Sequence, residues 1–184
     1  MSKNNTLSIL FASRLVEEKG VDILIDCIEK IQNDPTLSDC VFWNIVSDGE
    51  YASQIEVLFQ KYPKNVCYFG KVDSQKLSKL YKENDLLFMP SRFLETFGLT
   101  ALESLASGTP VLGFSKGGLV SFIPDSLAID PHNPVNDCIL KIRSFLEFGI
   151  PEPISIDEFR KETWIKNLTN LFFPSQNIVI LHDY

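Results

Sequence analysis

Short runs of consecutive apolar residues alternate along this chain with segments in which apolar residues recur every three or four positions. Apolar runs of this length, rich in Val, Ile, Leu and Phe, predict strands that are buried on both faces. We expect strands at Leu7–Ala12, Val41–Val46, Val66–Tyr68, Leu86–Met89 and Val111–Phe114, with a weaker one at Leu127–Ile129.

The periodic segments between these runs predict amphipathic helices, because a three- and four-residue spacing places apolar side chains on one helical face. We expect helices at Val21–Gln32, Ser53–Lys61, Ser74–Glu83, Gly98–Ser107, Val135–Phe148 and Ile156–Phe172. The alternation of strands and helices predicts an α/β fold with a Rossmann-like, doubly wound parallel sheet. Such sheets bind ligands beyond the carboxyl ends of their strands, so the loops there are the informative ones.

Composition limits the classes of protein that fit. The 184 residues, 45% of them hydrophobic, suit one domain, which we place at residues 7–173 with boundary segments at 1–6 and 174–184. A net charge of −7 with no basic block argues against nucleic-acid binding. Four scattered cysteines, and two histidines fifty positions apart, argue against a disulfide framework and a metal site. No apolar run approaches the roughly 18 residues of a membrane span, so we expect a cytoplasmic protein.

The loop after the first predicted strand carries two cations, Arg14 and Lys19, just before a helix. A guanidinium fork and an ammonium group near a helix N-terminus are suited to an anion. The spacing alone leaves a second interpretation open, in which both cations are solvated beside Glu17 and Glu18.

The loop after the fourth predicted strand combines a helix start with two acids. Gly98 stands where the helix opens, and Glu95 and Glu103 are separated by seven residues. Backbone N–H groups at a helix N-terminus suit phosphate, whereas carboxylates beside phosphate must bind something neutral, such as sugar hydroxyls. This pattern indicates a sugar nucleotide; two exposed acids without a ligand are the alternative. Similarly, Gly117-Gly118 fits either close approach to a ligand or an ordinary tight turn.

Several motifs are absent from the sequence. No G-x-G-x-x-G follows the first strand, and no G-x-x-x-x-G-K-[ST] occurs, which argues against dinucleotide binding and P-loop NTPases. No two aspartates flank a single residue, so the acidic clamp that holds a metal on a diphosphate is missing. A diphosphate bound here would have to be neutralised by Arg14, Lys19 and the helix end, without a metal ion.

Two segments resemble a known family. The stretch F-A-S-R-L followed by E-K-G is similar to a G/S-R-L-x-x-x-K-G loop, and E-T-F-G-L-T-A-L-E-S-L-A-S-G-T-P-V contains an E-x7-E signature. Together they resemble the C-terminal, donor-binding half of retaining glycosyltransferases with the GT-B fold, specifically family 4. The resemblance covers about Leu7 to Ile129 and implies metal-independent transfer from a nucleotide-diphosphate sugar to a glycan, lipid or protein acceptor.

The resemblance also implies roles for individual side chains. Arg14 and Lys19 would bind the diphosphate and stabilise the leaving group, Glu95 would bind the transferred sugar, and Glu103 would bind the ribose hydroxyls.

Further roles would fall to the backbone. In this family pattern Phe97, Gly98 and Leu99 would offer N–H groups to the sugar or the phosphate. Gly70 to Val72 would lie beside the base. The base, the sugar and the acceptor stay unnamed, because such pockets recognise bases largely through backbone groups.

The chain also departs from the family pattern. Ser121 stands where a glutamate usually follows the Gly-Gly pair. The chain begins at the first strand of the donor half, so we expect an acceptor-binding half in the same or another chain. Contact with a membrane could be made through that half. The tail at Ile178–Tyr184 is similar to the opening strand of another Rossmann half.

Two other functions stay open beside that of a glycosyltransferase donor-binding domain. They are a non-catalytic partner subunit of a split glycosyltransferase, and half of a GT-B epimerase or phosphorylase.

Overall fold

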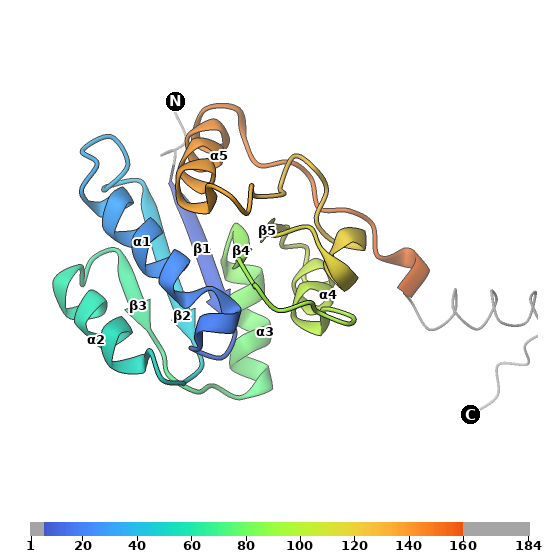
Figure 1. Ribbon diagram of the computed structural model, residues 1–184, viewed down its shortest axis with the longest axis horizontal. Coiled ribbons are helices and arrows are strands. Elements are labelled where there is room, and N and C mark those ends of the chain that lie inside the picture. The colour runs from blue at the N-terminus through green and yellow to red at the C-terminus, as the bar shows by residue number, and fades with distance from the viewer. Residues whose placement is uncertain (1–5, 160–184) are drawn as a thin grey trace, which may run out of the picture. The chain divides into compact units, whose positions relative to one another are not determined.

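The computed structural model describes residues 6–159 of the chain (Figure 1). The chain divides into two compact units, Met1–Ile154 and Ser155–Tyr184. In the second unit the described part contains one 3-10 turn, Asp157–Phe159. The rest of the helix predicted at Ile156–Phe172, the predicted domain end at 173 and the tail lie outside the described residues.

A five-stranded parallel sheet forms the centre of the first unit. Its spatial order is β3-β2-β1-β4-β5, with every neighbouring pair parallel. The strands are β1 (Leu7–Ala12), β2 (Val41–Val46), β3 (Val66–Tyr68), β4 (Leu86–Met89) and β5 (Val111–Gly113). The order confirms the Rossmann-like, doubly wound sheet.

The prediction of a weaker strand at Leu127–Ile129 is wrong. Only Ala128 forms a bridge, with Gly113. Gly113 is the last residue of β5, and the backbone hydrogen bonds of Leu127 and Ile129 both go to this one residue. The pairing between the two segments therefore stops at a single bridge.

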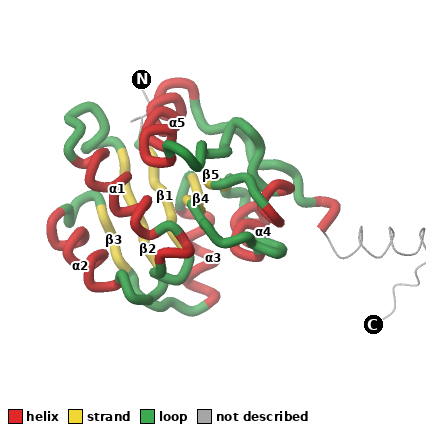
Figure 2. The backbone as a smooth tube through the Cα atoms, viewed as in Figure 1, coloured by secondary structure: helices red, strands yellow, loops and turns green. Residues whose placement is uncertain are grey.

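Helices cover both faces of the sheet. In Figure 1, α1, α2 and α5 lie in front of it, and α3 and α4 lie behind. The pairs α1–α5 and α3–α4 are in contact, which agrees with this division. Figure 2 shows the same alternation of strand and helix along the chain. The helices are α1 (Val21–Gln32), α2 (Ala52–Lys61), α3 (Ser74–Glu83), α4 (Leu99–Ala106) and α5 (Pro134–Phe148).

The predicted helices form because capping residues at their ends and apolar side chains along one face favour the same segments. The carboxylate of Asp73 accepts a hydrogen bond from the Lys76 backbone N–H at 2.8 Å and so caps α3. Pro134 occupies the first turn of α5, where its missing N–H costs nothing. The side chains of α1 at three- and four-residue spacing, including Leu24 and Ile28, are fully buried.

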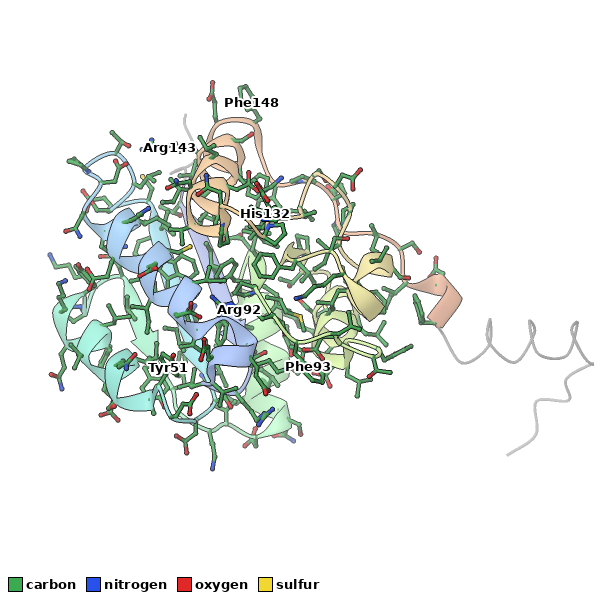
Figure 3. All side chains as sticks on the ribbon, viewed as in Figure 1. Tyr51, Arg92, Phe93, His132, Arg143 and Phe148 are labelled. Carbon is green, nitrogen blue, oxygen red and sulfur yellow. The ribbon has the colours of Figure 1, made fainter. Side chains whose placement is uncertain are left out.

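The core lies between the sheet and its two helical layers. Trp43 on β2 and Phe88 on β4 are buried and meet edge to face, with ring centroids 5.7 Å apart. A few large apolar side chains remain exposed, among them Phe148 at the end of α5 (Figure 3). No helix of residues 6–159 is long and apolar enough to cross a membrane.

The turn after β1 is brought against the end of β4 by a glycine. Gly20 has a φ of 74°, and a Cβ on it would lie 2.2 Å from the carbonyl oxygen of Pro90. Only a residue without a side chain fits this contact. The 3-10 turn Glu17–Lys19 therefore lies directly beside the loop that leaves β4.

Candidate functional site

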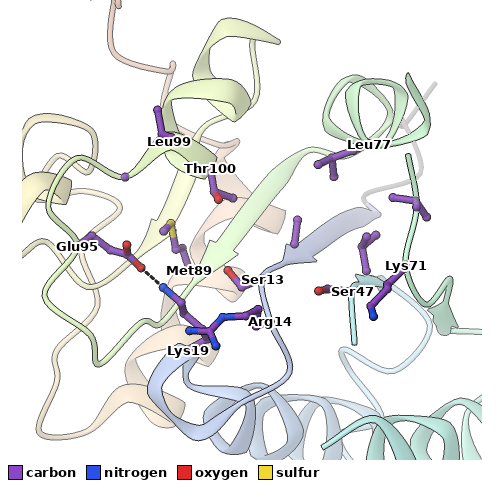
Figure 4. A pocket seen from close by; sticks show the side chains of 14 residues that line it. Ser13, Arg14, Lys19, Ser47, Lys71, Leu77, Met89, Glu95, Leu99 and Thr100 are labelled. Carbon is purple, nitrogen blue, oxygen red and sulfur yellow. Dashed lines mark hydrogen bonds and ion pairs between the residues drawn. The ribbon is translucent and has the colours of Figure 1, made fainter. Parts of the chain in front are cut away.

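A cavity of about 350 Å³ opens at the carboxyl ends of the strands. The loops after β1, β2, β3 and β4 and the start of α4 contribute its walls (Figure 4). Of the residues predicted for the site, the structure brings these to the cavity: Arg14, Lys19, Val72, Glu95, Gly98 and Leu99. The parallel sheet thus places the two predicted loops, about 80 residues apart in sequence, around one space.

The two predicted cations differ in how they are held. The Arg14 guanidinium lies 3.8 Å from the Glu18 carboxylate, and both side chains are about two-thirds exposed. Such a pair contributes little, so Arg14 is free to meet an anion. Lys19 is only 15% exposed and forms an ion pair with Glu95, with its ammonium 5.2 Å from the centre of the Phe93 ring. Lys19 therefore points into the cavity with its charge already matched.

Glu95 is fixed by the loop around it. Its Oε1 accepts hydrogen bonds from Lys19 and from the Ser91 hydroxyl, the latter at 3.1 Å. The loop in turn is tied to the Glu17–Lys19 turn, because the backbone N–H groups of Arg92 and Phe93 both donate to the Glu18 carbonyl, at 2.8 and 3.1 Å. Glu95 and Lys19, which are predicted to bind different parts of a donor, are thus held by two loops that are hydrogen-bonded to each other.

The Gly117-Gly118 pair supports this loop from the other side. The Gly118 N–H donates to the Glu95 carbonyl at 2.7 Å, and a Cβ on Gly118 would lie 2.6 Å from the Thr96 carbonyl oxygen. The close approach is therefore to the backbone beside Glu95, and neither residue of the pair lines the cavity. Ser121, at the end of the same turn, is exposed.

The start of α4 faces the cavity through its backbone. Gly98 precedes the helix with a φ of 74°, and no side chain caps the N-terminus. Gly98, Leu99 and Thr100 line the cavity, as expected for N–H groups that could hold a phosphate or a sugar oxygen. Phe97 lies outside the lining, and its ring packs edge to face against Phe122 with centroids 6.1 Å apart.

The opposite wall is formed after β2 and β3. Val72 lines the cavity together with Leu77 and Lys71. Gly70 does not line it, and its carbonyl accepts a hydrogen bond from the Ser47 N–H at 2.8 Å. Lys71 is largely exposed, 3.4 Å from the Asp48 carboxylate.

Glu103 lies outside this cavity, in a neighbouring one of about 290 Å³ between α3 and α4. The Tyr81 hydroxyl donates to its Oε2 at 3.1 Å. Tyr81 is 2% exposed, and burial, followed by the Glu103 charge, raises the pKa of its hydroxyl well above the usual value. Leu77 belongs to the walls of both cavities, so Glu103 stands next to the main cavity rather than in it.

Sequence reasoning missed several lining residues. Ser13 and Ser47 follow β1 and β2 directly, so position at the end of a buried strand was the signal that could have identified them. Met89, at the end of β4, shows the same signal. Within residues 6–159, no three His, Cys, Asp or Glu side chains come together in a group able to hold a metal ion.

Comparison with known proteins points to one family. Residues 2–152 match the family described as Glycosyl transferases group 1. An uncharacterized glycosyltransferase of Methanocaldococcus jannaschii is 32% identical over 166 residues, which are 85% of this chain and 41% of that protein. The chain spans between 29% and 41% of the length of that protein and two other curated relatives.

Solved structures agree on the fold. The crystal structure of TarM matches 92% of this chain and 35% of its own, with a TM-score of 0.70 and 24% identity. HepE of Anabaena, crystallised with UDP-glucose, matches 78% of this chain and 40% of its own, with a TM-score of 0.63 and 24% identity. Together with the sheet order and the family match, these similarities show that the chain belongs to the glycosyl transferases group 1 family and folds as one half of a GT-B glycosyltransferase.

Proposed function

We propose that this chain is the donor-binding half of a retaining glycosyltransferase, and that it binds a UDP-sugar without a metal ion. One observation carries the proposal: Arg14, Lys19, Glu95 and the uncapped start of α4 surround a single cavity at the carboxyl ends of the strands. A diphosphate needs the cations and the helix end, and a sugar needs an acceptor for its hydroxyls. HepE, with UDP-glucose, supports UDP as the first nucleotide to test.

Arg14 and Lys19 bind the diphosphate in this proposal. As the bond between the sugar and the diphosphate breaks, negative charge grows on the leaving diphosphate, and the two cations beside it stabilise that charge more than the charge of the intact donor. Gly98 and Leu99 add backbone N–H groups at the positive end of α4. Because these groups supply the electrostatic stabilisation, the proposed reaction assigns no step to a metal ion.

Glu95 binds hydroxyls of the transferred sugar, and its position beside Lys19 places the sugar next to the diphosphate. Val72, two residues after Gly70, borders the base. Glu103 binds the ribose from the adjoining cavity, where the Tyr81 hydroxyl orients its carboxylate. The acceptor would come from a further half, so we expect this chain alone to bind the nucleotide and to transfer sugar slowly or not at all.

The test is calorimetric titration of the chain with UDP, GDP and ADP, each with and without EDTA. We expect UDP to bind equally in both conditions. Removing the charged partner of a phosphate costs about 1.5–3 kcal/mol, so Lys19→Ala should weaken binding about ten- to a hundredfold, and Glu103→Ala should weaken it as well. The matched control is Lys79→Ala, which removes an exposed lysine of α3 that does not line either cavity.

Three results would contradict parts of the proposal. Binding that EDTA abolishes would show that a metal is needed, and absence of binding by all three nucleotides would remove the donor-site assignment. Turnover by the chain alone at about 1 s⁻¹ or faster would contradict the need for an acceptor half.

A further inference from the structure

Ser47 has an unusual backbone conformation at the edge of the cavity. Its φ is 103°, and within residues 6–159 no other residue except glycine has a positive φ. That region is strained for a residue with a Cβ, and such strain persists only where the surroundings hold it. Here the Ser47 N–H donates to the Gly70 carbonyl at 2.8 Å, and the Ser47 carbonyl accepts from the Tyr68 hydroxyl at 3.1 Å. Tyr68 at the end of β3 and Gly70 in the loop after it thus hold both the carbonyl and the N–H of Ser47.

The conformation presents the Ser47 side chain to the cavity. β1 and β2 pair Ala12 with Val46, so the next residues, Ser13 and Ser47, leave the sheet side by side. Both line the cavity. In the view of Figure 4 the Ser47 hydroxyl lies near that of Ser13, between Arg14 and Lys71. Among the described residues, no side chain or backbone group forms a hydrogen bond with the Ser47 hydroxyl.

This position lies between the two ends of the donor as proposed above. Arg14 and Lys19 mark the diphosphate on one side, and Val72 marks the base on the other. A group between them meets the nucleoside, close to the ribose. A serine hydroxyl can donate one hydrogen bond and accept others, so it suits either a ribose hydroxyl or a polar edge of the base.

We propose that Ser47 is a nucleoside-contacting residue of the donor site, and that its strained conformation is kept because it aims the hydroxyl at the donor. This inference rests on the proposed function, since it needs a nucleotide in the cavity. The competing explanation is that the strain belongs only to the exit of the chain from β2, in which case glycine would serve better and the hydroxyl would have no role.

Two substitutions separate these explanations. Ser47→Gly removes both the strain and the hydroxyl, whereas Ser47→Ala removes the hydroxyl and keeps the strained Cβ. We expect both variants to bind UDP about two- to tenfold more weakly, the usual worth of one neutral hydrogen bond. The melting temperature should rise by about 2 °C in Ser47→Gly and stay near the wild-type value in Ser47→Ala. Ser53→Ala, an exposed serine of α2, is the matched control.

Inorganic pyrophosphate identifies the part of the donor that Ser47 touches. Lys19→Ala should weaken both UDP and pyrophosphate, whereas the Ser47 variants should weaken UDP and leave pyrophosphate unchanged. If wild-type protein binds UDP and Ser47→Ala binds it equally well, the inference is wrong and the proposed function stands. Equal losses for UDP and pyrophosphate would also overturn it, as would a lower melting temperature in Ser47→Gly. If the wild type binds no nucleotide, the proposed function fails and the inference falls with it.

Discussion

Arg92 connects the loop that carries Glu95 to helix α1, and removing this connection tests how the site is held. Its two terminal nitrogens donate to the two carboxylate oxygens of Asp22, each at 2.5 Å, and Nη1 also donates to the Glu17 carbonyl at 3.1 Å. The Arg92 hydrogen bonds hold the pKa of Asp22 below its usual value. The same pair raises the pKa of Arg92. The perturbation is therefore a double-mutant cycle with Arg92→Ala, Asp22→Ala and the double variant.

The magnitude follows from geometry and exposure. A bidentate arginine–carboxylate pair is the strong form of a surface ion pair, but both side chains here are about 40% exposed, so water screens the attraction. We expect a coupling free energy of about 1 kcal/mol at pH 7 and low salt. Arg92→Ala should cost more than Asp22→Ala, because it also leaves the Glu17 carbonyl without this donor.

The sign of the pH dependence is fixed by the lowered pKa of Asp22. A carboxyl whose folded pKa lies below its unfolded value of about 3.9 stabilises the protein above that value. The stabilisation is lost as the pH falls through the folded pKa. The coupling should therefore be the same at pH 7 and pH 5 and should decline only below about pH 4.

The assay is urea unfolding of the four proteins at each pH, followed by circular dichroism, with UDP titration alongside. Because Arg92 anchors the loop of Glu95, Arg92→Ala should also weaken UDP binding a few-fold. Arg143→Ala is the matched control, since Arg143 forms an ion pair with Asp34 away from the cavity. A coupling energy near zero at pH 7, or one that grows on acidification, would refute this reasoning.

Other contacts around the site give further expected outcomes. Gly118→Ala should cost about 1–3 kcal/mol and weaken UDP binding, because its Cβ would meet loop backbone 2.6 Å away. Gly108→Ala, strained at φ 85° but with nothing within 4 Å, should destabilise without changing UDP affinity. Tyr81→Phe should weaken UDP but not pyrophosphate, since Glu103 loses its orienting hydrogen bond. Tyr62→Phe, which removes a similar Tyr–Glu bond outside both cavities, should leave both affinities unchanged; equal effects from the two tyrosines would contradict the role of Glu103.

The sheet could be predicted from the sequence because its strands are buried on both faces. A strand covered by helices on each side must be apolar at consecutive positions, as in Leu86–Met89, where all four residues are buried. The same rule failed at Leu127–Ile129, where Leu127 and Ile129 are buried without a strand. Apolar character reports burial, whereas a strand also needs a neighbour with free backbone groups along its length.

The candidate site could be predicted in part. Cations after β1 and the glycine before α4 are local signals, and the parallel sheet brings them together. The position of Glu103 could not be predicted, because the helical stripe of α4 says only that this residue is at the edge of the buried face. The Tyr81 hydroxyl, from another helix, determines where that carboxylate lies. The role of Gly118 was hidden for the same reason, since its partner is the backbone of a distant loop.

The ion pair between Lys19 and Glu95 explains how an acid can stand in a site proposed for phosphate. An isolated carboxylate there would repel a diphosphate, and an isolated lysine ammonium, 15% exposed, would be poorly solvated. Paired, each group neutralises the other until a donor arrives. The diphosphate then takes over as partner of Lys19, and Glu95 is released toward the sugar hydroxyls, still held by the Ser91 hydroxyl. In this scheme Lys19 always has an anionic partner, and the Glu95 carboxylate exchanges its ion pair for hydrogen bonds from sugar hydroxyls.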